Sequence, residues 1–159
     1  TMKIKFLIFF LLLAFCSNSE ITSKNIEIQD FQIQQLTDLE TNKNSELDSN
    51  FLIINYWASW CLECIEEHDL LISLNEIKSF EGKVVLISFQ DNTSNSKEFL
   101  NKYGYGNLIY LTDLKSKFAI NSGVFGVPET HIIQNGIIIR KYLGPLSFGD
   151  VEEIIFLYS

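Results

Sequence analysis

Three apolar runs mark the middle of the chain. Residues 51–57 (FLIINYW) and 83–90 (KVVLISFQ) are almost continuous in apolar side chains, which is typical of strands covered on both faces of a sheet. Residues 107–113 (NLIYLTD) follow as a third candidate strand. The pattern therefore predicts a buried sheet built around these runs.

The segments between the runs show helical periodicity. Apolar side chains recur near helical spacing from Cys61 to Phe80, and Gly82 follows where a helix is expected to stop. The positions predicted to face inward are Cys64, Leu71, Leu74 and Ile77. Residues 94–104 (SNSKEFLNKYG) predict a shorter amphipathic helix, which begins at a serine or asparagine cap and ends at a glycine.

A hairpin is predicted near the C-terminal end of the chain. Residues 130–134 (THIIQ) and 136–144 (GIIIRKYLG) flank the pair Asn135-Gly136, which is the strongest short-range hairpin signal. These two strands are therefore expected to be antiparallel.

The remaining segments complete the order of elements. Residues 31–36 (FQIQQL) alternate as an edge strand does, and 37–50 form a polar connection rich in turn formers. Residues 114–120 predict one or two helical turns, and 147–159 predict a final helix with Asp150 as its cap.

The order of elements is βαβαβ, a short helix and then ββα. Parallel strands need crossover connections, whereas the tight turn makes the last two strands antiparallel. The predicted class is α/β, with a central mixed sheet of parallel strands plus a C-terminal antiparallel hairpin, flanked by helices. One domain over residues 31–159 accounts for all of these elements, and the sequence contains no repeats or low-complexity tracts.

The start of the chain has the pattern of an export signal or membrane anchor, predicted over residues 1–16. Two lysines precede an unbroken apolar run from Phe6 to Phe15, and a polar tether is predicted over 17–30. A run of about ten residues is short for a membrane span, which needs about 20. Cleavage, an uncleaved anchor and lipidation at Cys16 remain open. Each places the domain on the oxidising side of a membrane.

Composition narrows the class of partner. The chain is 47% hydrophobic, which suits a domain with a substantial core, and its formal net charge is −8. Acidic and basic residues are scattered, with no basic stripe, so nucleic acid is excluded as a partner.

Cys61 and Cys64 carry the candidate chemistry. Cys61 lies where a buried strand turns into a helix, and there the free amide groups and the helix dipole favour a thiolate. Cys64 follows one turn later, close enough to resolve a mixed disulfide. The arrangement of strand, Trp-Cys-x-x-Cys and helix indicates a redox-active pair.

Three alternatives compete with a redox pair. A structural disulfide over so short a loop stabilises little, because the entropy of loop closure grows with loop length. A soft metal is an alternative because Cys61, Cys64 and His68 share a helical face, but a structural zinc site needs a fourth ligand and only the distant His131 is offered. The third alternative is that the two cysteines are core residues that happen to be close.

Two stretches resemble a known family. "WASWCLECIEEH" (57–68), followed by "GVFGVPET" (123–130), resembles the thioredoxin superfamily. More narrowly, these stretches resemble the membrane-tethered CcmG/DsbE group, relatives of ResA and TlpA, which act in cytochrome c maturation. "QD" at 90–91 and "NGIIIRKYLGPL" support the resemblance. The pair Leu62-Glu63 departs from the family, which more often has proline or a small polar residue there, and this departure leaves the reduction potential open.

The resemblance implies roles for two acids. Glu67 resembles the family's partly buried acid, which exchanges a proton with the resolving Cys64, and desolvation would raise its pKa toward neutrality. Glu129 resembles a second acid beside the substrate-binding face. The alternative for both is an ordinary solvated carboxylate.

The resemblance also implies a substrate-binding face. Pro128 would be a cis-proline facing the cysteines, with the backbone of Val127 free to pair with an extended substrate, whereas the alternative is an ordinary trans turn. Trp60 would flank the thiolate and offer an apolar surface, unless it merely packs. We expect His68 on the helix surface or at a cap.

The implied function is that of a periplasmic disulfide reductant in cytochrome c maturation. Its partners would be apocytochrome c or an apocytochrome-handling thiol protein, and a membrane electron donor of the DsbD/CcdA type. No metal and no cofactor beyond the redox-active dithiol are implied. The alternatives are a general exported thiol–disulfide oxidoreductase, a reductant for copper-site assembly, and a non-enzymatic tethered module that binds unfolded chains or carries a metal.

Overall fold

The computed structural model describes residues 30–48 and 50–159. The predicted signal or anchor (1–16) and nearly all of the predicted tether (17–30) lie outside the described residues. Within the described part of the chain, no helix has the length and apolar character needed to span a membrane.

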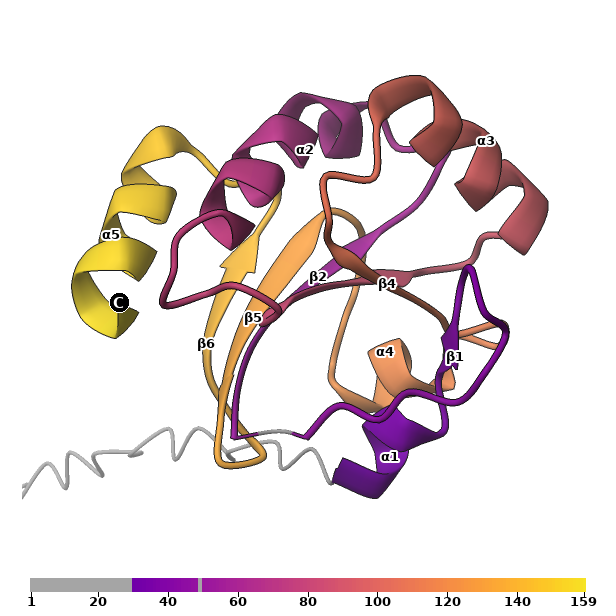
Figure 1. Cartoon of the computed structure of the whole chain (residues 1–159), viewed down its shortest axis with the longest axis horizontal. Helices are drawn as coiled ribbons and strands as arrows, with labels where there is room; N and C mark the ends of the chain where they lie inside the picture. The colour runs from indigo at the N-terminus through magenta and orange to yellow at the C-terminus, as the bar shows by residue number, and fades with distance from the viewer. Residues whose placement is uncertain (1–29, 49) are drawn as a thin grey trace, which may run out of the picture.

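A six-stranded mixed sheet forms the centre of the fold, with the strand order β1-β4-β3-β2-β5-β6 (Figure 1). The strands are β1 (Thr37–Asp38), β2 (Phe51–Trp57), β3 (Val84–Ser88), β4 (Ile109–Thr112), β5 (Glu129–Gln134) and β6 (Ile137–Leu143). β2, β3 and β4 are parallel, whereas β5 is antiparallel to both β2 and β6. The predicted fold class, with parallel strands followed by an antiparallel hairpin, is confirmed.

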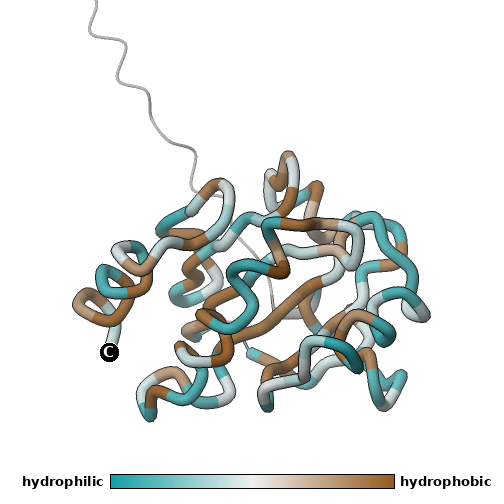
Figure 2. Tube along the Cα trace, turned by 90° about the horizontal axis from the view of Figure 1, so that it is seen from above, coloured by the Kyte–Doolittle hydropathy of each residue, from teal (hydrophilic) through white to brown (hydrophobic). Residues whose placement is uncertain are grey.

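Helices cover both faces of this sheet (Figure 1). The helices are α1 (Asp30–Gln34), α2 (Leu62–Asn75), α3 (Thr93–Tyr103), α4 (Lys117–Asn121) and α5 (Phe148–Tyr158). One hydrophobic cluster lies between the sheet and α2, α3 and α5, and a second lies on the opposite face beneath α1 and α4. Figure 2 shows hydrophobic residues along the strands in the middle of the fold and mainly hydrophilic ones in the outer turns.

The predicted edge strand over residues 31–36 is wrong. The segment forms the short helix α1 over Asp30–Gln34 and then a turn, in which the Leu36 N–H donates to the Ile33 carbonyl at 2.9 Å, so Ile33 and Leu36 are both buried whereas Gln34 and Gln35 are exposed. The edge strand is instead β1, which lies in the segment predicted to be a polar connection and pairs antiparallel with β4.

The helix that follows the cysteines is shorter than predicted. It ends at Asn75 rather than Phe80, and the Asn75 side chain binds the turn that follows. Its Oδ1 atom accepts the Gly82 N–H at 3.2 Å, and its Nδ2 atom donates to the Asn107 carbonyl at 3.1 Å. Gly82 therefore belongs to the turn beyond the helix, where its φ is +70°.

The turns at the C-terminal end agree with the sequence except for one cap. Asn135 and Gly136 both adopt positive φ, as the predicted tight hairpin requires. The cap of α5 is Ser147 rather than Asp150, because the Ser147 Oγ atom accepts the Asp150 N–H. The Asp150 carboxylate accepts the Ser147 N–H in return, which completes a capping box.

Candidate active site

Cys61 and Cys64 lie at the junction of β2 and α2. Cys61 is the N-cap residue of α2, and its Sγ atom accepts the Cys64 N–H at 3.1 Å. The two residues are joined by a disulfide, their Cα atoms are 5.3 Å apart, and both side chains are buried. The helix begins here because the backbone is extended at Cys61, as is typical of an N-cap residue. The Cys61 sulfur then accepts an amide N–H of the first turn that has no partner within the helix.

The segment before Cys61 is held by the loop that follows β3. The Asp91 carboxylate accepts the Ser59 N–H at 2.7 Å, and the Trp60 indole N–H donates to the Gln90 carbonyl at 3.3 Å. Ser96 supplies a further hydrogen bond to Asp91. Gln90-Asp91, which the sequence offered only as a point of resemblance, thus fixes the position of the residues that lead into Cys61.

Two large apolar side chains flank Cys61. Trp60 is 60% exposed and Leu62 is 69% exposed. Trp60 is therefore not buried in the core, and its ring remains available to another molecule. Together the two side chains form an apolar rim beside a disulfide that is itself buried.

The loop before β5 lies at the same end of the sheet as the cysteines. Glu129 pairs with Tyr56 in the antiparallel register of β5 and β2, so Val127 and Pro128 lie beyond the end of β2, where the chain continues toward Cys61. Val127 also packs against the cluster that contains both cysteines. The Val127–Pro128 peptide bond is cis, as predicted.

A shallow groove of about 310 Å³ runs along this loop. Its lining includes Phe125, Val127, Pro128 and Leu143. Phe125 is 94% exposed and Leu143 is 75% exposed, so this groove offers apolar contacts at its rim.

Glu67 is a buried acid on α2. Its side chain is held from two sides: Asn55 Nδ2 donates to Oε1 at 2.8 Å and the Leu146 N–H donates to Oε2 at 2.8 Å. Burial raises the pKa of Glu67 to about 7, although both hydrogen bonds oppose that rise, and Glu63 adds to it. The expected buried carboxyl with a pKa near neutrality is therefore present one helical turn after Cys64.

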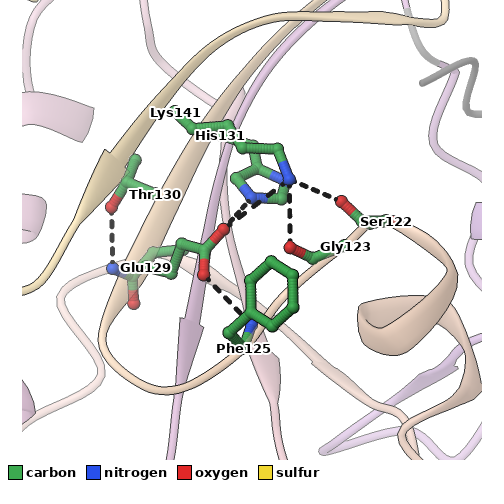
Figure 3. Close-up of polar contacts among 8 residues, drawn as sticks. Ser122, Gly123, Phe125, Glu129, Thr130, His131 and Lys141 are labelled. Atoms are coloured by element: carbon green, nitrogen blue, oxygen red, sulfur yellow. Dashed lines mark hydrogen bonds and ion pairs between the residues drawn. The ribbon is translucent and has the colours of Figure 1, made fainter. Parts of the chain in front are cut away.

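Glu129 is a second buried acid (Figure 3). It lies on the face of the sheet opposite to Glu67, because successive strand residues alternate in face and the next residue, Thr130, contacts Asn55 beside Glu67. His131 Nε2 lies 2.6 Å from Glu129 Oε1, and the Phe125 N–H donates to Oε2 at 3.3 Å. Burial lowers the pKa of His131, which favours the neutral ring, so we assign its proton to Nε2 as the donor to the Glu129 carboxylate. Glu129 thus ties the loop at Phe125 to the start of β5.

Lys141 on β6 completes this cluster (Figure 3). Its Nζ atom donates to the carbonyls of Ser122 at 2.8 Å and Gly123 at 3.1 Å, and lies 3.8 Å from Glu129 Oε1. The ammonium group therefore binds the residues that follow α4 and partly neutralises the buried carboxylate. Both ends of the segment 122–129 are fixed by these side chains.

The Redoxin family model matches residues 23–155 of the chain. The chain belongs to the Redoxin family. The match includes both cysteines, both buried acids and the groove. Its extent also covers every described helix and strand, apart from the last residues of α5.

Relatives of this Redoxin-family chain include proteins named DsbE. The chain is 34% identical over 113 residues to the "Probable thiol:disulfide interchange protein DsbE-2" of Pasteurella multocida, a match that covers 70% of the chain and 57% of the relative. It is 31% identical over 105 residues to the "Thiol:disulfide interchange protein DsbE" of Vibrio cholerae, which covers 65% of the chain and 55% of the relative. The resemblance to the DsbE group of the thioredoxin superfamily is confirmed, and the chain spans little more than half the length of these relatives.

Solved structures support the fold. Mycobacterium tuberculosis DsbF in its mixed oxidised and reduced forms matches with a TM-score of 0.67 and 20% identity, over 80% of this chain and 97% of that one. The thioredoxin-like fold that the sequence predicts is thereby confirmed.

His68 is at a helix cap, one of the two predicted positions, but that cap belongs to α3 and the side chain is not exposed. It is buried rather than on the helix surface, and its Nε2 atom lies 2.8 Å from the carbonyl of Gly104, the C-cap residue of α3. Its ring packs edge-on against Phe99. Among residues 30–48 and 50–159, no group of three His, Cys, Asp or Glu side chains is placed to hold a metal ion.

Several residues of the site were missed from the sequence. Asn55, Thr130, His131 and Lys141 all contact one of the two buried acids directly or through a neighbour. Asn55 carried a signal, because an amide inside an otherwise apolar strand needs buried hydrogen-bond partners. His131 carried a weak signal, because it lies two residues after Glu129 and alternate residues of a strand share a face, whereas Lys141 carried none, since only the pairing of β5 with β6 brings it to them.

Proposed function

We propose that this protein is a thiol:disulfide oxidoreductase that reduces disulfides in exported proteins. The observation that carries the proposal is the position of Cys61 at the N-cap of α2, bonded to Cys64 one turn later. In the reduced protein, the amide groups of the first turn favour a thiolate at Cys61. The names of the relatives, which are thiol:disulfide interchange proteins, support the same chemistry.

The proposed cycle transfers two electrons to the substrate. The Cys61 thiolate attacks one sulfur of a substrate disulfide, and the other sulfur leaves as a thiolate. The Cys64 thiolate then attacks Cys61 Sγ, which releases the second substrate thiolate and forms the Cys61–Cys64 disulfide. A membrane electron donor of the DsbD/CcdA type returns two electrons to the pair.

Glu67 serves this cycle as the proton acceptor for Cys64. A thiol must lose its proton before it attacks, and a buried carboxyl with a pKa of about 7 can take that proton at neutral pH. Glu67 lies three residues after Cys64 on α2, one helical turn away. Its burial keeps the transfer away from bulk water.

The groove beside Pro128 is the proposed substrate-binding face. An extended peptide would lie along Val127 and Pro128, with apolar side chains against Phe125, Leu143 and Trp60. A shallow and open groove suits an unfolded segment better than a small molecule. Glu129 contributes by holding this loop in place.

Apocytochrome c, or a thiol protein that handles it, is the proposed substrate. The resemblance to the CcmG/DsbE group supports this choice, as do the DsbE relatives. A c-type haem site contains two cysteines that close into a disulfide in an oxidising compartment, and haem attachment needs both thiols free. The proposed location is the periplasmic side of the inner membrane, with the N-terminal segment as anchor.

One pair of experiments tests the proposal. The reduced protein should reduce the disulfide of a peptide with a C-x-x-C-H haem site, whereas the protein with Cys61→Ser and Cys64→Ser should not. Deletion of the gene should lower covalent haem attachment, and an added thiol reductant should partly restore it. Normal haem-stained cytochromes would instead support a general oxidoreductase or a copper-site reductant, and rescue by the double variant would support a non-enzymatic module.

A further inference from the structure

Asn55 lies on β2, and its side chain contacts both the neighbouring strand β5 and Glu67 on helix α2. Its side chain is fully buried, as is that of Thr130 on the neighbouring strand β5. The Nδ2 atom donates twice, to Glu67 Oε1 at 2.8 Å and to Thr130 Oγ1 at 3.0 Å. Asn55 therefore uses both of its N–H groups on the side that faces the acid.

The two donors to Glu67 divide its oxygens between them. Leu146 binds Oε2 through its backbone N–H, and Asn55 binds Oε1. An N–H donor stabilises a carboxylate more than it stabilises a carboxylic acid. Only proline would remove the Leu146 N–H, and it would also constrain the backbone, whereas the Asn55 side chain can be replaced directly, so Asn55 is the adjustable donor.

The Thr130 hydroxyl accepts the second N–H of the Asn55 amide, while the acceptor-only carboxylate of Glu67 requires an N–H rather than a carbonyl oxygen to face it. Asn55 Oδ1 is buried and has no hydrogen-bond partner within the described part of the chain. Only the two Nδ2 bonds therefore hold the amide in its orientation. If the amide turned over, its carbonyl oxygen would face the Glu67 carboxylate and repel it.

We propose that Asn55, held by Thr130 and the Glu67 carboxylate together, is a positioning residue that fixes the Glu67 carboxyl and favours its ionised form. The acid can then both accept and release a proton during each cycle. This role in the cycle rests on the proposed exchange function, whereas the effect of Asn55 on the pKa of Glu67 does not. The groups that face Glu67 are Glu63 and Cys64 on its own helix, the Leu146 amide before α5, Asn55 on β2 and Thr130 behind it on β5.

The direction of the effect follows from the opposing contributions. Burial raises the pKa of Glu67 to about 7 and Glu63 adds to the rise, whereas the hydrogen bonds from Leu146 and Asn55 lower it. Removal of the Asn55 donor should therefore raise the pKa of Glu67 further. The acid would then keep its proton at neutral pH and accept one from Cys64 less readily.

A titration of the Glu67 side chain by carbon-13 NMR tests this inference. The Glu67 carboxyl signal is assigned as the one that is missing from the spectrum of Glu67→Gln. Because a hydrogen bond to a charged group is worth more than a neutral one, Asn55→Leu should raise the pKa of Glu67 by about one pH unit or more. Thr130→Val should raise it by less. Asn75→Leu is the matched control, since it removes another buried asparagine, which lies at the far end of α2, and it should leave the titration unchanged.

The pH profile of exchange supplies the second measurement. Asn55→Leu should move the profile to higher pH in the wild-type protein, and it should cause no further movement when Glu67→Gln is already present. If Asn55→Leu does not fold, Asn55→Ser and Thr130→Val take its place in both measurements. Valine has nearly the same shape as threonine, so Thr130→Val removes the hydroxyl with little change in packing. An unchanged Glu67 titration in the folded variants overturns the inference, whereas a wild-type protein without exchange activity overturns only the proposed function.

Discussion

Cys61 and Cys64 occupy unlike positions at the start of α2, although both are buried. The Cys61 sulfur lies at the N-cap and accepts an amide N–H, whereas Cys64 lies inside the first turn and faces the core. The two thiols of the reduced protein should therefore differ in reactivity.

We expect Cys61 to be alkylated first when the reduced protein is treated with a limiting amount of iodoacetamide. The free amide groups and the dipole of α2 favour the thiolate at Cys61, and the thiolate is the reacting form. Peptide mass spectrometry measures the modified fraction at each cysteine, with the two single serine variants as controls. Equal rates at the two sites would contradict this assignment.

Glu67→Gln should change how stability depends on pH. The folded protein holds the Glu67 pKa at about 7, above its usual value of 4.5, so between these values the folded state binds more protons than the unfolded state. This contribution makes the wild-type protein less stable as pH rises through that range, and glutamine does not titrate.

Urea unfolding at pH 5 and pH 8 measures this effect. Relative to the wild-type protein, Glu67→Gln should gain about 2–3 kcal/mol of stability between pH 5 and pH 8. Glu66→Gln, at an exposed neighbouring position, is the matched control and should show almost no such gain. A parallel response of wild-type and Glu67→Gln proteins would mean that Glu67 titrates as an exposed acid.

The sequence predicted the cysteines because their motif is local, and the resemblance to the CcmG/DsbE group, which also rests on a local stretch, implied the role of Glu67. It could not predict the partners of Glu67, because Asn55 is 12 residues before it and Leu146 is 79 residues after it. The burial of His68 was missed for a related reason. Its position on the helix face was visible, but the carbonyl of Gly104 that makes its burial tolerable comes from another helix.

At the scale of elements, the segment between α4 and β5 depends on one side chain of β6. Lys141 binds the carbonyls of Ser122 and Gly123, where α4 ends. The residues that follow carry the proposed substrate groove.

Lys141→Met should loosen this segment while it leaves the rest of the sheet intact. Loss of a charged donor to two carbonyls should speed amide hydrogen exchange over residues 122–128 by on the order of tenfold. Lys115→Met, at an exposed position near the start of α4, serves as the control. Unchanged exchange in the Lys141 variant would show that Glu129 alone fixes the loop.

Strong local signals decided which elements the sequence predicted correctly. The apolar runs of β2 and β3 and the Asn135-Gly136 turn are such signals, and each matches the structure. The pattern of residues 31–36 predicts a strand where the structure has α1. Three apolar residues over six positions fit the spacing of a strand and that of a helix equally well. The burial of α1 against the face of the sheet that α4 also covers decides the outcome.

Gly106 shows how closely two elements approach in a way that no pattern could indicate. A Cβ atom at this position would lie only 2.2 Å from Ile72 Cγ1 on α2, and the backbone has a φ of +56°. The connection from α3 to β4 therefore passes directly over the helix that carries the active-site residues.

At the scale of the whole molecule, the proposed role as a reductant predicts the reduction potential of the pair. We expect a value at or somewhat above roughly −270 mV, far from the roughly −120 mV of a strong oxidant. Equilibration with glutathione buffers, followed by alkylation and mass spectrometry, measures it. A value close to that of a strong oxidant would reverse the proposed direction of electron flow.

A substitution at Glu63 should shift the reduction potential in a direction that can be predicted. The exposed Glu63 carboxylate lies in the first turn of α2 and disfavours a thiolate at Cys61, so Glu63→Gln should make the pair slightly more oxidising, by roughly 10 mV. Glu66→Gln, one turn further along, should have a smaller effect. A shift in the opposite direction would contradict a repulsive role for Glu63.

The contact between Leu146 and Glu67 ties the first half of the domain to its end. A ribosome makes the chain from its N-terminus, so α2 and both cysteines exist well before residue 146 has been added. During that interval the cysteines are present without the completed surroundings of their acid. The chain therefore contains both thiols before it contains the amide that holds Glu67. Any partner that binds the unfinished chain meets two cysteines whose proton acceptor is not yet held in place.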